Sequence, residues 1–199
     1  MKLQRITKTL MAVLALSAAV LVCSGSASAG VKIQQWQTAS GAEVYFVENH
    51  DLPILDISVN FAAGSARDTA EKSGVAGITG YLMSLGAGGM SDEKIANSMA
   101  DVGAILGGDF DADRAGFKLR TLSSEREKTQ ALDVFTKILQ QPDFPAEVLA
   151  REKARIISGL QESATQPESI SSKAFMSALY GSHPYANPPA GLTSSIERI

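Results

Sequence analysis

The sequence contains few of the side chains that supply catalytic or metal-binding groups. Its 199 residues include two histidines, His50 and His183, and a single cysteine, Cys23. A zinc site that joined the two histidines would need a third ligand and a meeting across the fold, so we interpret both as turn residues. The sequence has no Ser/His/Asp arrangement, phosphate-binding loop or dinucleotide-binding fingerprint. It therefore offers no complete set of groups for hydrolytic or redox chemistry.

Three alternating acids, Asp109, Asp111 and Asp113, have the spacing of a calcium-binding loop. An EF-hand loop that starts at Asp109 would need Gly at its sixth position and Glu at its twelfth. Arg114 and Arg120 occupy those positions. The period-two alternation along GGDFDADRAGFKLR instead favours a strand with the acids on its solvent face. We therefore predict a strand here and no metal site.

The segment Gly74–Gly86, GVAGITGYLMSLG, is the most informative stretch of the chain. It resembles the active-site helix of the insulinase/pitrilysin-type zinc peptidases, in which an inverted H-x-x-E-H motif supplies two zinc ligands and the general base. Both ends of the segment match the family frame. The two His positions, however, fall on Gly77 and Tyr81, and the Glu position falls on Gly80. The resemblance thus implies the family scaffold without its zinc-binding groups.

Further motifs extend this resemblance over nearly the whole chain after the N-terminal region. In chain order they are Leu52-Pro53, Gly64-Ser65-Ala66-Arg67-Asp68, Phe144-Pro145-Ala146-Glu147, His183-Pro184-Tyr185 and Gly191-Leu192-Thr193-Ser194-Ser195-Ile196. The resemblance places the third zinc ligand of the family, a Glu, at Gly159. Glu162 lies three residues further on and could not replace it without a shift of register. We therefore expect no catalytic, metal-binding or cofactor-binding residue, and a chain from a non-catalytic branch of the family.

The residues now at the vacated positions allow two interpretations. Gly77 and Gly80 could open space for a partner's loop or a substrate chain, or they could permit close packing of helix on sheet where a larger side chain would clash. Glycine inside a helix costs about 1 kcal/mol relative to Ala. Of the two interpretations, we favour close packing. Tyr81 carries a phenol that is neutral at pH 7 and a poor zinc ligand. We interpret it as a side chain that fills the core or a cleft.

The pattern of strands and helices predicts an α+β domain with helices packed on one face of a mostly antiparallel sheet. We expect a hairpin from residues 31–38 and 42–48, a strand over 54–63, and a second strand pair over 104–110 and 112–122. Ser91 is expected to cap a helix over 92–102. Capping boxes at Ser124/Glu127 and Thr165/Glu168 are expected to open two more helices, with a further helix over 146–162 between them. Leu132, Phe135 and Leu139 are predicted to form the buried stripe of the first of these two.

The N-terminus reads as a secretory signal over residues 1–29. Three cations precede an apolar stretch, and Ala27-Ser28-Ala29 resembles a cleavage site before Gly30. Lipidation at Cys23 is the alternative, although Val22 fits the preceding position poorly. We expect export, and a bacterial periplasm as the destination. Residues 30–199 would then form one domain, truncated at its C-terminus before a final strand. That domain has 15 Lys and Arg against 21 Asp and Glu, which argues against a nucleic-acid partner.

The resemblance implies a non-catalytic subunit of an exported zinc metallopeptidase complex. Its partner would be a catalytic paralogue of the same fold that carries the zinc, and its substrate a peptide or an unfolded polypeptide. This chain would shape the substrate chamber and support the active partner. The alternatives are a stand-alone periplasmic peptide-binding or scaffolding protein, or an inactive fragment of a longer chain.

Overall fold

The computed structural model describes residues 31–199. The predicted signal segment, Cys23 and the proposed cleavage point after Ala29 lie outside the described residues. The chain divides into two compact units, with the boundary after Asp51. In the first, β1 (Ile33–Gln37) pairs antiparallel with β2 (Glu43–Val47), which confirms the predicted hairpin.

The second unit contains a three-stranded antiparallel sheet with the strand order β3–β7–β6. The strands are β3 (Ile54–Phe61), β6 (Ile105–Phe110) and β7 (Ala115–Leu122). The register places Ile57 opposite Leu119 on one face, whereas Asp56 lies opposite Arg120 on the other. Side chains alternate between the two faces of a strand, so each strand contributes one apolar and one polar row. This arrangement confirms the predicted fold class.

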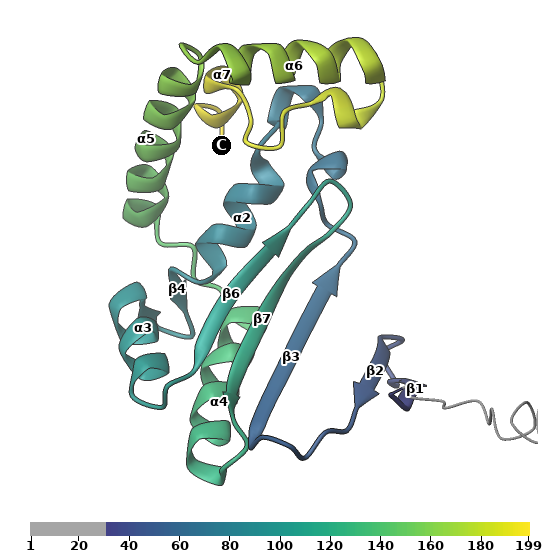
Figure 1. The fold of residues 1–199 in the computed structure, drawn as a ribbon. Helices are drawn as coiled ribbons and strands as arrows, with labels where there is room; N and C mark the ends of the chain where they lie inside the picture. The colour runs from purple at the N-terminus through teal and green to yellow at the C-terminus, as the bar shows by residue number, and fades with distance from the viewer. Residues whose placement is uncertain (1–30) are drawn as a thin grey trace, which may run out of the picture. The chain divides into compact units, whose positions relative to one another are not determined.

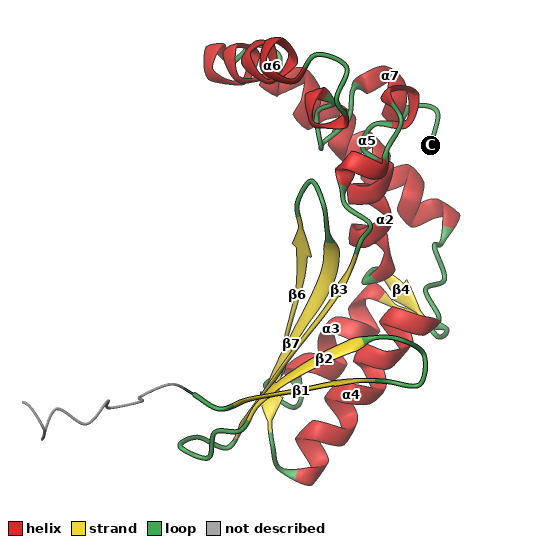
Figure 2. Ribbon diagram, turned by 90° about the vertical axis from the view of Figure 1, so that its right-hand side faces the viewer, coloured by secondary structure: helices red, strands yellow, loops and turns green. Residues whose placement is uncertain are grey.

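Two helices cover the apolar face of this sheet: α3 (Asp92–Ala100) and α4 (Glu125–Gln140). In Figure 1, α4 lies behind the strands, and Figure 2 shows both helices on the same side of the sheet. Leu119 and Ile138 lie at the centre of this core and are 1% and 0% exposed. A short hairpin of β4 (Gly86–Ala87) and β5 (Met90–Ser91) connects α2 (Val75–Met83) to α3.

A second group of helices follows the sheet: α5 (Ala146–Ser163), α6 (Pro167–Tyr180) and α7 (Thr193–Ile196). The apolar faces of α5 and α7 pack against α2 (Val75–Met83) in a separate small core. Its buried members are Ile78, Leu82, Val148 and Ile196. Three 3₁₀ turns complete the unit: η1 (Ser65–Arg67), η2 (Ala70–Lys72) and η3 (Pro184–Ala186). In residues 31–199 no helix is both long and apolar enough to cross a membrane.

The predicted helix caps are only partly correct. Ser91 caps α3 as expected, since its hydroxyl accepts a hydrogen bond from the Lys94 amide at 3.2 Å. The predicted box at Ser124 is wrong, because Ser124 donates to the Glu127 carboxylate and caps no backbone amide. The predicted box at Thr165 is also wrong, because α6 begins at Pro167 and the Thr165 hydroxyl donates to the Glu162 carbonyl. In both cases the polar side chain has a nearer partner than the helix amides.

The buried stripe of α4 is rotated by about one residue from the predicted one. Phe135 is buried as predicted, whereas Leu132 and Leu139 are only partly buried. The fully buried positions beside Phe135 are Ala131, Val134 and Ile138.

The prediction that all three acids lie on a strand is wrong for two of them. Asp109 lies in β6 and forms an ion pair with Lys118 on β7. Asp111 and Asp113 lie instead in the turn that joins β6 to β7. There the Asp111 carboxylate accepts hydrogen bonds from the amides of Asp113 and Arg114, both at 2.7 Å. Asp residues favour such turns because their carboxylates can bind backbone amides two or three residues further on.

Candidate functional site

Helix α2 starts from a tight turn that Asp68 stabilises. The Asp68 carboxylate accepts hydrogen bonds from the Gly74 amide at 2.9 Å and the Ala76 amide at 3.1 Å. Gly74 has φ +98°, a left-handed conformation that favours glycine. A carboxylate at a helix N-terminus satisfies free amides and complements the helix dipole. This contact gives a physical reason for the predicted Gly64–Asp68 motif.

The loop before α7 fixes the same end of α2. The Ser195 hydroxyl donates to the Ser73 carbonyl at 2.6 Å, and the Ser73 hydroxyl donates to the Pro188 carbonyl at 2.7 Å. A Cβ on Gly191 would lie 2.6 Å from that Ser73 carbonyl, so only glycine fits there. The Gly191–Ile196 motif therefore anchors the start of α2.

The positions that the resemblance assigned to the zinc motif all lie on α2. The expected close packing is wrong at Gly80, whereas Gly77 does lie against Phe110 of β6. A Cβ on Gly80 would meet no atom within 4 Å, and one on Gly77 would make an ordinary contact of 3.5 Å with the Phe110 ring. Tyr81 is 43% exposed and so does not fill the core. The space beside Gly80 is consequently open.

Gly159, the assigned position of the third ligand, lies on α5 and is exposed. A Cβ there would likewise meet no atom within 4 Å. The neighbouring turns of α5 carry a buried carboxylate, Glu152, which is 5% exposed. It is bound by two arginines of its own helix: Arg155 Nε lies 2.7 Å from Glu152 Oε2, and Arg151 Nε lies 3.0 Å from Oε1.

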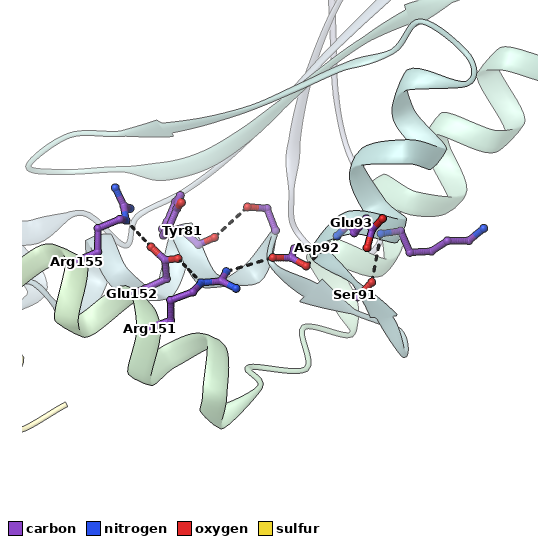
Figure 3. A network of polar contacts seen from close by, with 9 residues as sticks. Tyr81, Ser91, Asp92, Glu93, Arg151, Glu152 and Arg155 are labelled. Carbon is purple, nitrogen blue, oxygen red and sulfur yellow. Dashed lines mark hydrogen bonds and ion pairs between the residues drawn. The ribbon is translucent and has the colours of Figure 1, made fainter.

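Arg155 connects this network to α2, as Figure 3 shows. Its guanidinium carbon lies 5.2 Å from the centroid of the Tyr81 ring, a cation–π distance. At the other end, Arg151 Nη2 donates to Asp92 Oδ2 of α3 at 3.1 Å. Residues from three helices thus meet in one polar row beside the open glycines.

The electrostatics of this row favour the charged forms of its members. Burial opposes ionisation of Glu152, but hydrogen bonds from Arg155 and Arg151 outweigh it and lower the pKa of the carboxyl. The pKa of Asp92 is lowered by the Glu93 amide and by Arg151. The hydrogen bond to Glu152 raises the pKa of Arg155 above its ordinary value.

The donor chemistry at the assigned positions does not fit zinc. Gly77, Gly80 and Gly159 carry no side chain, and the Tyr81 ring lies against a guanidinium. In the part of the chain that the structure describes, no group of three His, Cys, Asp or Glu residues could hold a metal ion. The arrangement instead offers guanidinium hydrogen-bond donors, an aromatic face and open backbone.

The two histidines lie in different units. His50 is exposed, and its Nε2 lies 2.8 Å from Glu48 Oε1. His183 caps η3, because its Nδ1 accepts a hydrogen bond from the Tyr185 amide at 3.2 Å. The Tyr185 hydroxyl in turn donates to Asp113 at 2.6 Å, which ties this loop to the β6–β7 turn.

Sequence reasoning did not single out Arg151, Glu152 or Arg155. The signal that could have found them is the spacing R-E-x-x-R, which places two arginines beside one carboxylate on the same helix. The contact of Arg155 with Tyr81 joins distant segments, so no local pattern indicates it.

Comparison with known proteins gives one family. The sequence model described as insulinase (peptidase family M16) matches residues 44–191. The crystal structure of a peptidase M16 inactive domain from Pseudomonas fluorescens is 37% identical and superposes with a TM-score of 0.82. That match covers 85% of this chain and 41% of the other.

Two more distant proteins also match. The crystal structure of a protease from Helicobacter pylori is 17% identical, with a TM-score of 0.76 over 85% of this chain and 41% of the other. An uncharacterized zinc protease from Rickettsia felis is 22% identical over 153 residues, which are 75% of this chain and 37% of the relative. The chain therefore spans well under half the length of these relatives. Since the family match extends over most of its length, from β2 to the loop before α7, this chain belongs to the insulinase family of peptidases, M16.

Proposed function

We propose that this chain is a non-catalytic, peptidase-like subunit of an exported zinc metallopeptidase complex. The observation that carries the proposal is the set of residues at the vacated family positions. Three are glycines, of which Gly80 and Gly159 lie in open space, and the fourth residue, Tyr81, lies under Arg155. A zinc ion and its activated water need imidazole, thiolate or carboxylate groups, and none stands at these positions.

The name of one relative supports the same conclusion. The Pseudomonas fluorescens protein is called an inactive domain of peptidase M16, and its 37% identity to this chain makes it more than a shared fold. In the proposed complex, a catalytic paralogue of the same fold binds the zinc and cleaves the peptide. This chain forms one wall of the substrate chamber and stabilises its partner. The proposed export to the periplasm rests on the predicted signal segment, residues 1–29.

The proposal is tested by measuring the zinc content and the peptidase activity of the full chain. The chain is purified alone and together with a catalytic M16 paralogue encoded beside it. We expect the isolated chain to retain no zinc and to cleave no peptide, because it lacks the ligands. The pair should co-purify and show cleavage that a chelator abolishes. Zinc-dependent cleavage by the isolated chain would overturn the proposal. A monomeric chain that binds peptides but no paralogue would instead favour the stand-alone binding protein.

A further inference from the structure

Glu152 binds two arginines of α5, Arg151 and Arg155, and leaves one edge of the Arg155 guanidinium available to a ligand. Glu152 uses one carboxylate oxygen for each arginine, and in both cases the donor is Nε. The terminal Nη nitrogens of these arginines form no hydrogen bond with the buried carboxylate. In Arg151, one Nη nitrogen donates a hydrogen bond to Asp92. Among the described residues, no hydrogen bond or ion pair involves the Nη nitrogens of Arg155, whose side chain is 63% exposed.

Tyr81 restrains the position of the Arg155 guanidinium. The guanidinium lies over the Tyr81 ring while Glu152 holds its Nε, so two contacts on different sides restrain one side chain. Such restraint lowers the entropy that a flexible arginine would lose on binding a ligand. An arginine fork presented in this way matches a carboxylate, which accepts two parallel hydrogen bonds.

Next to Arg155 on α5, the backbone carries no side chain at Gly159. Gly159 lies one helical turn beyond Arg155, and Gly80 precedes Tyr81 directly. A Cβ at either glycine would meet nothing within 4 Å. Residues four apart on a helix are neighbours on one face, so the surface next to the guanidinium can admit a ligand chain.

The charges of the row also favour an anionic ligand at Arg155. Glu152 is buried and faces only its two arginines, so the solvent side of this pair is cationic. Asp92 offsets the charge at Arg151, on the side toward α3. We infer that Arg155, held over the Tyr81 ring and bordered by Gly159, binds a carboxylate group of a peptide, supplied by an acidic side chain or by the C-terminus. The inference rests on the proposed function in taking the ligand to be a peptide.

Fluorescence polarisation with labelled peptides tests this site on the full chain. Three peptides of one apolar sequence are compared: one with an internal Glu and an amidated end, one with a free C-terminal carboxylate, and one neutral and amidated. We expect one of the first two to bind at least about tenfold more tightly than the neutral peptide, because a charge-assisted hydrogen bond is worth that much. The stronger of the two identifies the source of the carboxylate. Equal affinity for all three peptides, or no binding, would overturn the inference.

Two variants locate the binding. Arg155→Gln should lower the affinity for the preferred peptide about tenfold. Arg126→Gln removes the same charge from an exposed arginine of α4 and should change nothing. Gly159→Gln should weaken binding by filling the open surface, and since Gln favours a helix over Gly it should not unfold the chain. Full binding by Arg155→Gln would contradict the site.

This experiment and the test of the proposed function can fail separately. Zinc-dependent cleavage by the isolated chain would overturn the non-catalytic role and leave peptide capture at Arg155 intact. Absence of carboxylate preference in a chain that neither binds zinc nor cleaves would overturn only the site.

Discussion

At the scale of single residues, glycines of this chain serve opposite purposes. Gly191 is required by the fold, because its φ of +81° and the nearby Ser73 carbonyl leave no room for a side chain. Gly80 and Gly159 have no such constraint, since neither has a positive φ or a neighbour within 4 Å of a Cβ. Each lies inside a helix, where glycine is less favourable than alanine by about 1 kcal/mol. Their presence therefore keeps a surface open at some cost in stability.

Gly80→Ala and Gly159→Ala should each raise the free energy of unfolding, by roughly 0.5–1 kcal/mol, because alanine loses less backbone entropy in a helix. Gly191→Ala is the matched control and should lower it by about 1 kcal/mol or more, through strain at positive φ. Chemical denaturation of the three variants measures both effects. Destabilisation by Gly80→Ala would mean that the space beside Tyr81 is filled.

At the scale of elements, α5 combines a core face with a charged row. Val148, Ile156 and Leu160 pack into the small core with α2, while Glu152 lies buried between Arg151 and Arg155. A buried carboxylate that lost its partners would be destabilising, so the two arginines are needed to place this helix. Because both guanidiniums remain exposed to water, the gain from these ion pairs is smaller than for a fully buried pair.

Glu152→Gln should lower the free energy of unfolding by about 1–3 kcal/mol at neutral pH, because two charge-assisted hydrogen bonds weaken. The pKa of Glu152 is lower in the folded chain than its ordinary value of 4.5. Its ionisation therefore stabilises the fold fully above that value, and this stability is lost as the pH falls toward the folded pKa. Denaturation curves between neutral pH and pH ~3 should thus show the wild-type and Glu152→Gln chains converging in acid.

Glu162→Gln, at an exposed carboxylate near the end of the same helix, is the control and should stay close to wild type at every pH. A gap between wild type and Glu152→Gln that persists unchanged at low pH would show that ionisation of Glu152 contributes nothing.

At the scale of the whole molecule, α6 stands out because none of its residues is buried. Phe175 and Leu179 are 63% and 58% exposed, and they lie four residues apart on one face. Apolar surface of this kind marks an interaction face or an aggregation risk. The relatives are more than twice as long as this chain, so they contain further structure that could lie against such a face.

Replacing both side chains, Phe175→Ser with Leu179→Ser, should change the free energy of unfolding by no more than about 0.5 kcal/mol, since they already meet water. The same double variant should bind less of a hydrophobic dye and self-associate less. Leu119→Ala is the contrasting change, because Leu119 is 1% exposed in the main core. It should cost about 2–5 kcal/mol. A large loss of stability in the α6 variant would reveal that this face is packed.

The sequence by itself determined the elements and the family. Alternating strands, helical periodicity and the cap at Ser91 are local, so they could be predicted without coordinates. The resemblance across residues 74–86 and the later motifs indicated the same family that the comparison gave. Local patterns were wrong about the helix caps at Ser124 and Thr165, because each hydroxyl forms a hydrogen bond with another nearby group.

Only the tertiary structure decided whether the positions of the missing zinc motif are packed or open to solvent. Whether Gly80 is packed or open depends on distant segments, and the prediction of close packing there was wrong. The anchoring of α2 by Asp68 and Ser195 and the placing of Arg155 over Tyr81 arise from chain segments that meet only in the folded domain. Such contacts depend on three-dimensional distance, which residue types and their spacing along the chain do not fix.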